Sequence, residues 1–98
     1  MKYSIYYIFH PLDVYLGYVG HSKDPLQRAY QHNYDTTNKL KYEWLSSLNY
    51  EGFLIAITED GAAQNLTEVL KREQYWMDTF RNDGFVLLNM RNAYSFRR

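Results

Sequence analysis

The sequence has no cysteine and no long apolar segment, and these two absences exclude several classes of protein. Without cysteine the chain forms neither a disulfide framework nor a thiolate metal site, which fits a reducing compartment. No run approaches the roughly 18 apolar residues that a membrane-spanning helix needs. The first residues also lack the charged and apolar regions of a signal peptide. We therefore expect a soluble, cytoplasmic protein with no membrane association.

Composition indicates one small globular domain with an uneven charge distribution. Of the 98 residues 46% are hydrophobic, and the formal net charge is zero. Residues 42–70 sum to −5, whereas residues 20–41 and 71–98 sum to +2 and +3. The two positive segments could form one basic face, although evenly solvated charges with no partner explain the count equally well. The 11 tyrosines favour contact surfaces, including those that stack bases or bond phosphates.

Short aromatic, β-branched segments and helical patterns predict a small α+β domain. We expect the following elements: strands at 3–9 and 14–20 joined as an antiparallel hairpin, helices at about 25–34, 38–48 and 62–80, a central or well-covered strand at 53–58, and a short strand or extended segment at 85–89. The predicted fold is a three-stranded antiparallel sheet with flanking helices in the order β-β-α-α-β-α. It would span residues 1–90, followed by a basic C-terminal tail at 91–98.

A glutamate interrupts the apolar stripe of the last predicted helix. The stripe consists of Leu66, Val69, Leu70, Trp76, Met77 and Phe80, and position 73 is Glu73. A carboxylate on the core side is costly unless it is paired, bound to a metal or open to a cleft. The last two cases make Glu73 functional. The alternatives are a buried ion pair with an arginine from another segment, or a position at the stripe's edge beside Lys71 and Arg72.

The predicted helix at 25–34 carries Arg28 and His32 one turn apart on one face. Asp24 and Pro25 are typical of a helix start. The guanidinium of arginine suits a phosphate, and a neighbouring histidine can donate to the same group or move a proton. The alternative is an ordinary solvated helix face.

Two tyrosines of the predicted hairpin form a third candidate pair. Tyr6 and Tyr18 would share one face of the sheet if their register paired them directly, which needs a three-residue connection at 11–13 or a bulge at Gly17. The alternative is that both are core tyrosines. The histidines have no recognised metal spacing, so we predict no zinc site.

Taken in chain order, the candidates form one series: Ser4-Ile5-Tyr6, Tyr18-Val19-Gly20, Arg28, His32, Glu73 and Asn89. This series resembles the GIY-YIG nuclease family across nearly the whole chain, and the predicted element order agrees with the fold of that family. Two positions depart from the family pattern. Ser4 stands where the first triplet usually has glycine, and Val19 stands where the second has isoleucine.

The resemblance implies metal-dependent hydrolysis of DNA phosphodiesters, leaving 5′-phosphate and 3′-hydroxyl ends. It implies Glu73 as the sole protein ligand of one Mg²⁺ or Mn²⁺ ion, and Arg28 as a clamp on a phosphate oxygen. Tyr6, with Tyr18 as its partner, would act as general base, although either tyrosine could take that role. His32 would contact the phosphate or relay the proton.

The same resemblance assigns supporting roles and a partner. Lys23, in the loop after the second strand, and the metal would favour a phenolate. Gly20 completes the second triplet, and Asn89 would be a hydrogen-bond donor next to the glutamate, or an ordinary strand-ending asparagine. DNA is the expected partner. We expect weak DNA binding, or specificity supplied by a homodimer or a protein partner, because 98 residues leave no room for an added DNA-binding segment.

The predicted tail offers an accessory DNA contact through the following residues: Arg91, Tyr94, Phe96, Arg97 and Arg98. A frayed terminus is the equally good alternative. For the whole chain, the alternative function is a catalytically inactive nucleic-acid-binding or protein-interaction module on the same scaffold.

Overall fold

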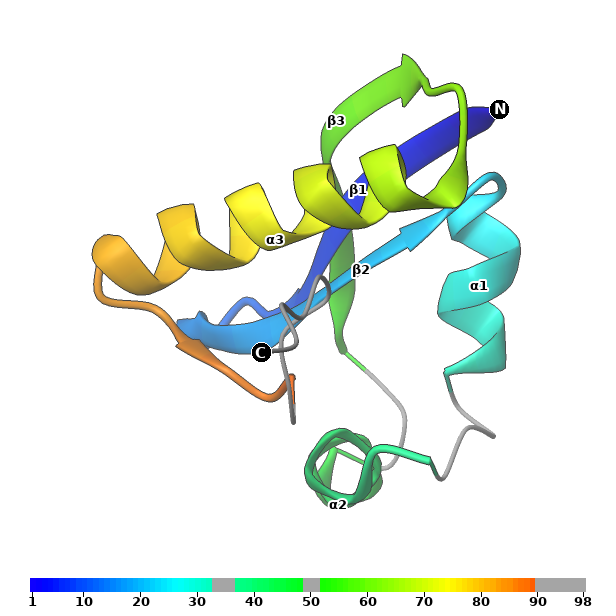
Figure 1. Ribbon diagram of the computed structural model, residues 1–98. Helices are drawn as coiled ribbons and strands as arrows, with labels where there is room; N and C mark the ends of the chain where they lie inside the picture. Colours follow the sequence, from blue (N-terminus) through cyan, green and yellow to red (C-terminus); the bar gives the residue numbers. More distant parts are fainter. Residues whose placement is uncertain (33–36, 49–51, 90–98) are drawn as a thin grey trace.

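The computed structural model describes residues 1–32, 37–48 and 52–89. Its elements are, in chain order: β1 (Lys2–His10), β2 (Asp13–Ser22), α1 (Pro25–Gln31), α2 (Lys39–Ser47), β3 (Leu54–Ala62), α3 (Leu66–Asn82) and β4 (Val86–Leu87) (Figure 1). The predicted α+β class is confirmed. The predicted tail at 91–98 lies outside the described residues. Within them, no helix has the length and apolar character to cross a membrane.

The sheet has four strands and is mixed, so the predicted three-stranded antiparallel sheet is wrong in this respect. The strand order is β3-β1-β2-β4, and β1 pairs antiparallel with both β3 and β2. The additional strand, β4, pairs parallel with β2 at Leu16 and Gly17. A turn after α3 at Gly84, with φ of 89°, directs the chain back to this edge. Leu88 N then donates to Gly17 O at 2.8 Å.

The third strand lies at an edge of the sheet and is partly exposed, so it is not the central or well-covered strand that the sequence predicts. Leu54 and Ile57 are 50% and 45% exposed. A continuous apolar run does not by itself distinguish an edge strand from a central one. The strand also continues to Ala62, beyond its predicted end at residue 58, and Glu59 and Asp60 accept hydrogen bonds from β1. The third helix therefore begins four residues later than predicted.

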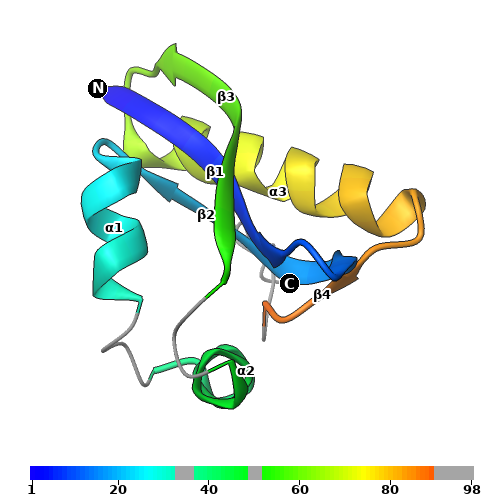
Figure 2. The ribbon, with the colours of Figure 1, turned by 180° about the vertical axis from the view of Figure 1, so that it is seen from behind.

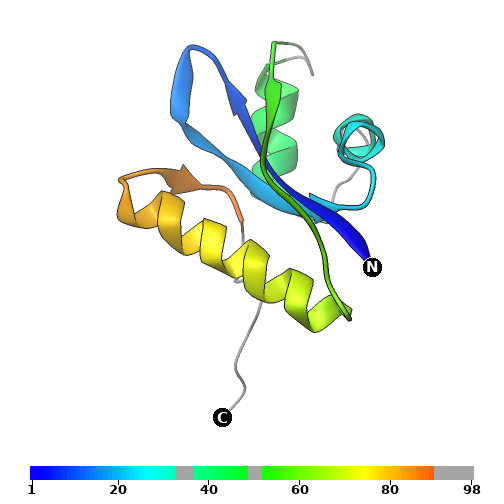
Figure 3. The ribbon, with the colours of Figure 1, turned by 90° about the horizontal axis from the view of Figure 1, so that it is seen from above.

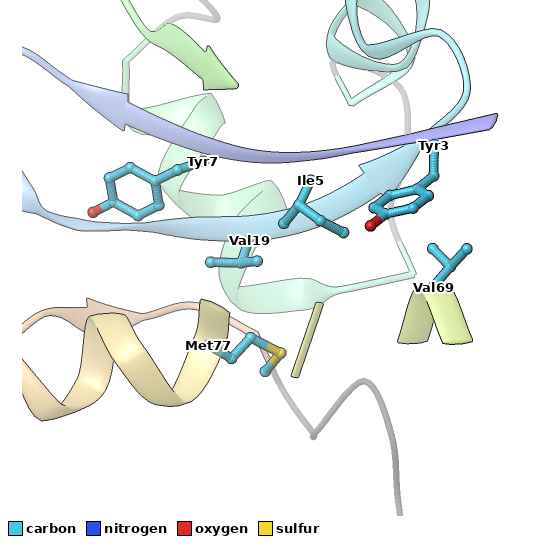
Figure 4. Packing of buried hydrophobic residues seen from close by; sticks show 6 residues of the cluster. All are labelled: Tyr3, Ile5, Tyr7, Val19, Val69 and Met77. Atoms are coloured by element: carbon cyan, nitrogen blue, oxygen red, sulfur yellow. The ribbon is translucent and has the colours of Figure 1, made fainter. Parts of the chain in front are cut away.

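The main core lies between α3 and one face of the sheet. Figure 4 shows its buried side chains: Tyr3, Ile5 and Tyr7 of β1, Val19 of β2, and Val69 and Met77 of α3. The helices α1 and α2 lie on the other side of the β1–β2 hairpin (Figures 2 and 3). Because side chains alternate along a strand, Tyr6 and Ile8 point toward α1 and α2, away from this core.

The buried side of α2 carries Leu45 and Lys41 rather than Leu40. Leu45 and Lys41 are fully buried, whereas Leu40 is 51% exposed. The cause lies at the helix start. Asn38 Oδ1 accepts from Lys41 N at 3.0 Å, while Asn38 Nδ2 donates to Leu88 O at 2.9 Å. This double contact fixes the N-terminus of α2 against the segment that follows β4.

The carboxylate of Glu59 links β3 to both β1 and α3. It accepts hydrogen bonds from Tyr3 Oη, from Trp76 Nε1 at 3.0 Å, and from Arg72, whose Nη2 lies 2.6 Å from Oε1. The hydrogen bonds from Arg72, aided by Tyr3 and Trp76 and opposed by burial, lower the pKa of Glu59 from 4.5 to about 2. The ionised form is therefore stabilised in the folded chain.

This shift predicts an acid-dependent loss of stability. A carboxyl whose folded pKa is lowered stabilises the fold above its unfolded pKa and loses that contribution as the pH falls toward the folded value. We expect the free energy of unfolding, measured with urea, to fall between about pH 4.5 and pH 2, and to fall less in Glu59→Gln. The exposed Glu43→Gln is the control and should follow the wild type. An unchanged acid dependence in Glu59→Gln would contradict this account.

Candidate active site

A buried chain of three polar side chains crosses the face of the sheet that α1 and α2 cover. Tyr6 Oη lies 2.7 Å from His32 Nε2, and His32 Nδ1 lies 2.5 Å from Lys41 Nζ. All three residues are at most 1% exposed. These side-chain contacts thus join the central strand β1, the residue after α1, and α2. Buried polar groups in contact of this kind stabilise one specific arrangement of the elements that carry them.

Tyr18 lies against two of these three side chains, His32 and Lys41. Its ring centroid is 5.3 Å from that of His32, in an edge arrangement, and 5.0 Å from Lys41 Nζ. Tyr18 and Tyr6 share one face of the sheet, but they are not paired directly. Tyr6 pairs with Gly20, and Tyr18 pairs with Ile8. The two tyrosines are therefore diagonal neighbours, which is close enough for long side chains to share a site.

The register of the hairpin explains why the two tyrosines share a face. Phe9 pairs with Gly17 and His10 pairs with Asp13, so the register shifts between these two pairs. Of the two conditions considered, the three-residue connection is not the one found, because the turn itself contains only Pro11 and Leu12. The irregularity adjoins Gly17, where the sequence analysis allowed for a bulge.

Gly20 leaves the space that Tyr6 needs to reach His32. A Cβ built on Gly20 would lie 2.4 Å from Tyr6 Oη and 2.5 Å from Tyr6 Cζ. The tyrosine therefore passes directly over the backbone of β2 at this residue. Glycine is required here because of close approach, since any side chain would displace the phenol.

On the other face of the sheet, α3 presents Glu73 to the end of β2. Glu73 is 7% exposed and lies in the buried stripe with Val69 and Met77, as predicted. Its Oε2 is 3.1 Å from His21 Nδ1. The neighbouring Arg72 bonds Glu59 instead, so it is not the buried partner of Glu73.

Asn89 bonds the edge of β2 between the buried Tyr6, His32 and Lys41 side chains on one face of the sheet and Glu73 on the other. Its Nδ2 donates to Val19 O at 2.8 Å, and its Oδ1 accepts from Val19 N at 3.0 Å. The side-chain amide thus bonds Val19 as a neighbouring strand would, beyond the two residues that β4 supplies. Asn89 therefore bonds the backbone of β2. It orders the strand where Tyr18 and Gly20 face α1 and α2 while Val19 faces α3.

The two predicted cationic residues lie near the ends of α1. Arg28 lies on α1 and its Nη1 donates to Gln31 Oε1 at 3.4 Å. Residue 32 stays one turn from it, because His32 N donates to Arg28 O at 3.1 Å. Lys23 is exposed in the loop between β2 and α1, and it lines a surface cavity of about 510 Å³ together with Lys2 and His21.

The electrostatics around Tyr6 favour the neutral phenol in this structure. Burial raises the pKa of Tyr6 well above its usual value, the neighbouring Tyr18 adds to the rise, and Glu73 contributes in the same direction. Arg28 opposes them, both by its charge and by a hydrogen bond to the phenol. Arg28 is therefore electrostatically coupled to Tyr6, and an added cation would act in the same sense.

The region of the chain that holds β1, β2 and α3 matches one known protein family. A family model described as the GIY-YIG catalytic domain matches residues 2–86. The chain belongs to the GIY-YIG family. Comparisons with curated proteins and with solved structures find no match. The GIY-YIG family is a nuclease-type family, and its members generally depend on a divalent metal ion.

The departure at Ser4 from the GIY-YIG pattern is accommodated locally. Ser4 is 5% exposed, and its hydroxyl donates to Asp60 Oδ1 of β3. The added side chain is therefore bonded to the neighbouring edge strand. This hydrogen bond satisfies the buried hydroxyl.

The carboxylate of the candidate site, Glu73, is chemically compatible with a magnesium ion. Within the ranges that the structure describes, no three His, Cys, Asp or Glu side chains gather as a metal-binding cluster. Mg²⁺ does not require such a cluster, because it keeps several waters and is held by one or two carboxylates plus substrate oxygens. Glu73 would supply one carboxylate, and its contact with His21 limits the orientation of that group.

The sequence did not predict two residues of this candidate site, His21 and Lys41. A signal for His21 was the alternation along β2, which places it on the same face as Val19 and so toward α3. A signal for Lys41 was its spacing of four residues from Leu45, which puts both on one side of α2. Neither signal has meaning before the pairing of the strands and the orientation of α2 are known.

The close approach at Gly20 yields a stability prediction. Gly20→Ala should lower the free energy of unfolding by about 1–3 kcal/mol, because the new methyl group overlaps the Tyr6 ring. Urea denaturation would measure this. In a Tyr6→Ala background the same substitution should cost much less, because the three nearest atoms all belong to Tyr6. An equal cost in both backgrounds would show that the crossing does not constrain residue 20.

Proposed function

We propose that the chain is a metal-dependent DNA endonuclease that leaves 5′-phosphate and 3′-hydroxyl ends. The observation that carries this proposal is the meeting of two groups at one short stretch of β2. Tyr6, Tyr18 and His32 lie on one side of residues 18–21, and Glu73 lies on the other side through its contact with His21. Proton-transfer groups and a metal-binding carboxylate at one strand are what phosphodiester hydrolysis requires.

Glu73 would hold the metal ion. Bound there, a divalent cation would stabilise the leaving 3′ oxygen and the added negative charge on the phosphate. Glu73 is 7% exposed, so few water molecules compete with a metal ion for the carboxylate oxygen that does not contact His21. His21 Nδ1 fixes the other oxygen at 3.1 Å and limits the rotation of the carboxylate.

Arg28 would bind a non-bridging oxygen of the scissile phosphate. Its guanidinium is permanently charged and presents paired donors that match a phosphate, which a lysine would not do. It is partly exposed on α1 and already acts on the Tyr6 phenol. A phosphate placed at Arg28 is therefore placed within the field of the proposed base.

Tyr6, with Tyr18 as its partner, would receive the proton of the attacking water. As the water oxygen bonds to phosphorus, its proton passes to the phenolate oxygen and the bond to the 3′ oxygen breaks. Burial opposes the phenolate in the substrate-free chain. The positive charges of Arg28 and of the bound cation would stabilise the phenolate. His32 Nε2, 2.7 Å from the phenol oxygen, can donate to that oxygen or relay the proton.

DNA is the proposed partner, and specificity would come from DNA structure, a second copy or another protein. Lys23 and Lys2 border the cavity that adjoins His21 and would contact the backbone next to the cut.

The metal role of Glu73 predicts that Glu73→Gln abolishes cleavage while the fold is kept. We expect a fall of about 1,000-fold or more, since several kcal/mol of transition-state stabilisation is lost. The assay uses plasmid, linear and branched DNA with Mg²⁺, Mn²⁺ or EDTA. Glu68→Gln, an exposed position on the same helix, is the matched control and should cleave normally.

Two outcomes would contradict the proposal. Cleavage retained in Glu73→Gln would remove this residue from the metal role. No cleavage of any substrate by the folded wild type would favour a module that binds nucleic acid without cutting it.

A further inference from the structure

Lys41 is a fully buried lysine that none of the proposed catalytic steps uses. It comes from α2, outside the motifs of β1, β2, α1 and α3, and it is 0% exposed. Burying a lysine is costly, so its position calls for a specific interaction. Its Nζ lies 2.5 Å from His32 Nδ1 and 5.0 Å from the centroid of the Tyr18 ring. It therefore contacts two of the proposed active-site residues at once.

With Lys41 in its charged form, the direction of both hydrogen bonds follows from the chemistry of the ammonium group. A lysine ammonium only donates, so His32 Nδ1 must accept. A neutral imidazole that accepts at Nδ1 carries its proton on Nε2. That proton points to Tyr6 Oη, 2.7 Å away. The contact of Nζ with the Tyr18 ring supports the charged form, because aromatic faces attract cations within about 6 Å.

The opposite arrangement is chemically distinct. A neutral Lys41 amine would accept from His32 Nδ1–H, and Nε2 would then accept the proton of Tyr6. In that case His32 would hold the hydroxyl proton of Tyr6 rather than leave it available. The two arrangements have the same heavy-atom positions and differ only in which histidine nitrogen is protonated.

We propose that Lys41 is a positioning residue that holds His32 in its Nε2–H form, so that His32 donates to the oxygen of Tyr6. Its consequence for catalysis rests on the proposed nuclease function. A hydrogen bond donated to the phenol oxygen stabilises the phenolate and directs the hydroxyl proton away from His32. This contact acts against the burial that raises the pKa of Tyr6. The series Lys41, His32, Tyr6 thus prepares the phenol to lose its proton.

Nuclear magnetic resonance of the whole chain tests this inference without any cleavage assay. Two-bond ¹H–¹⁵N correlations of ¹⁵N-histidine-labelled protein at neutral pH distinguish the two tautomers, and His32→Gln assigns the signal among the three histidines. We expect His32 to be a single Nε2–H tautomer. An Nδ1–H tautomer or a doubly protonated ring would overturn the inference, because neither can accept from Lys41.

Variants at Lys41 test the catalytic consequence. Lys41→Met keeps the apolar stem and removes the donor, so we expect His32 to lose the single tautomer and kcat to fall by about 10- to 100-fold with little change in KM. Lys41→Arg retains a donor and should restore the tautomer at least in part. An unchanged tautomer and rate in a folded Lys41→Met would overturn the proposal.

The failure of this inference and the failure of the nuclease function have different signatures. If the wild type cleaves no DNA but shows the Nε2–H tautomer, the hydrogen-bond direction stands and the proposed function falls. If the wild type cleaves DNA but His32 is Nδ1–H, the nuclease stands and the role of Lys41 falls. The wild-type spectrum decides the direction even where Lys41→Met does not fold.

Discussion

The passage of the Tyr6 side chain over Gly20 is the contact on which the rest of the structure depends. The phenol starts on the central strand, crosses β2 above a residue that has no side chain, and meets His32 on the far side. Through His32 it reaches Lys41 on α2. One line of buried polar contacts therefore fixes the residue after α1 and the helix α2 against the hairpin, on a face where the main core contributes nothing.

The two faces of the sheet carry different functional groups, and residues 18–21 of β2 contact both sets. The face toward α1 and α2 carries groups that can bind a phosphate and move protons, while the face toward α3 carries the apolar core and one carboxylate, Glu73. Alternation along residues 18–21 places neighbours on opposite faces, so a few residues of one strand reach both sets. Asn89, bonded to the backbone of Val19, keeps this stretch ordered where β4 has ended.

The sequence predicted the family, the α+β class and most of the elements, because these depend on local patterns. Glu73 stood out as a carboxylate in an apolar stripe, and the structure places it in the buried line of α3. The edge position of β3 and the pairing of the predicted segment at 85–89 with β2 were missed, since both depend on pairing between distant segments. Lys41 and His21 were missed for the same reason. A lysine in an apolar stripe gains meaning only when Asn38 fixes the orientation of its helix and His32 is found opposite.

The central claim is that side chains from both faces of the sheet serve one reaction centre at β2, and paramagnetic line broadening by Mn²⁺ tests it most directly. Titrating Mn²⁺ into ¹⁵N-labelled wild type should broaden signals most strongly around His21 and Glu73 and at residues 18–20, and progressively less along α3 toward Arg81. The broadening should disappear in Glu73→Gln. Broadening centred elsewhere, for example on Glu59 and Asp60, or unchanged in that variant, would contradict the account.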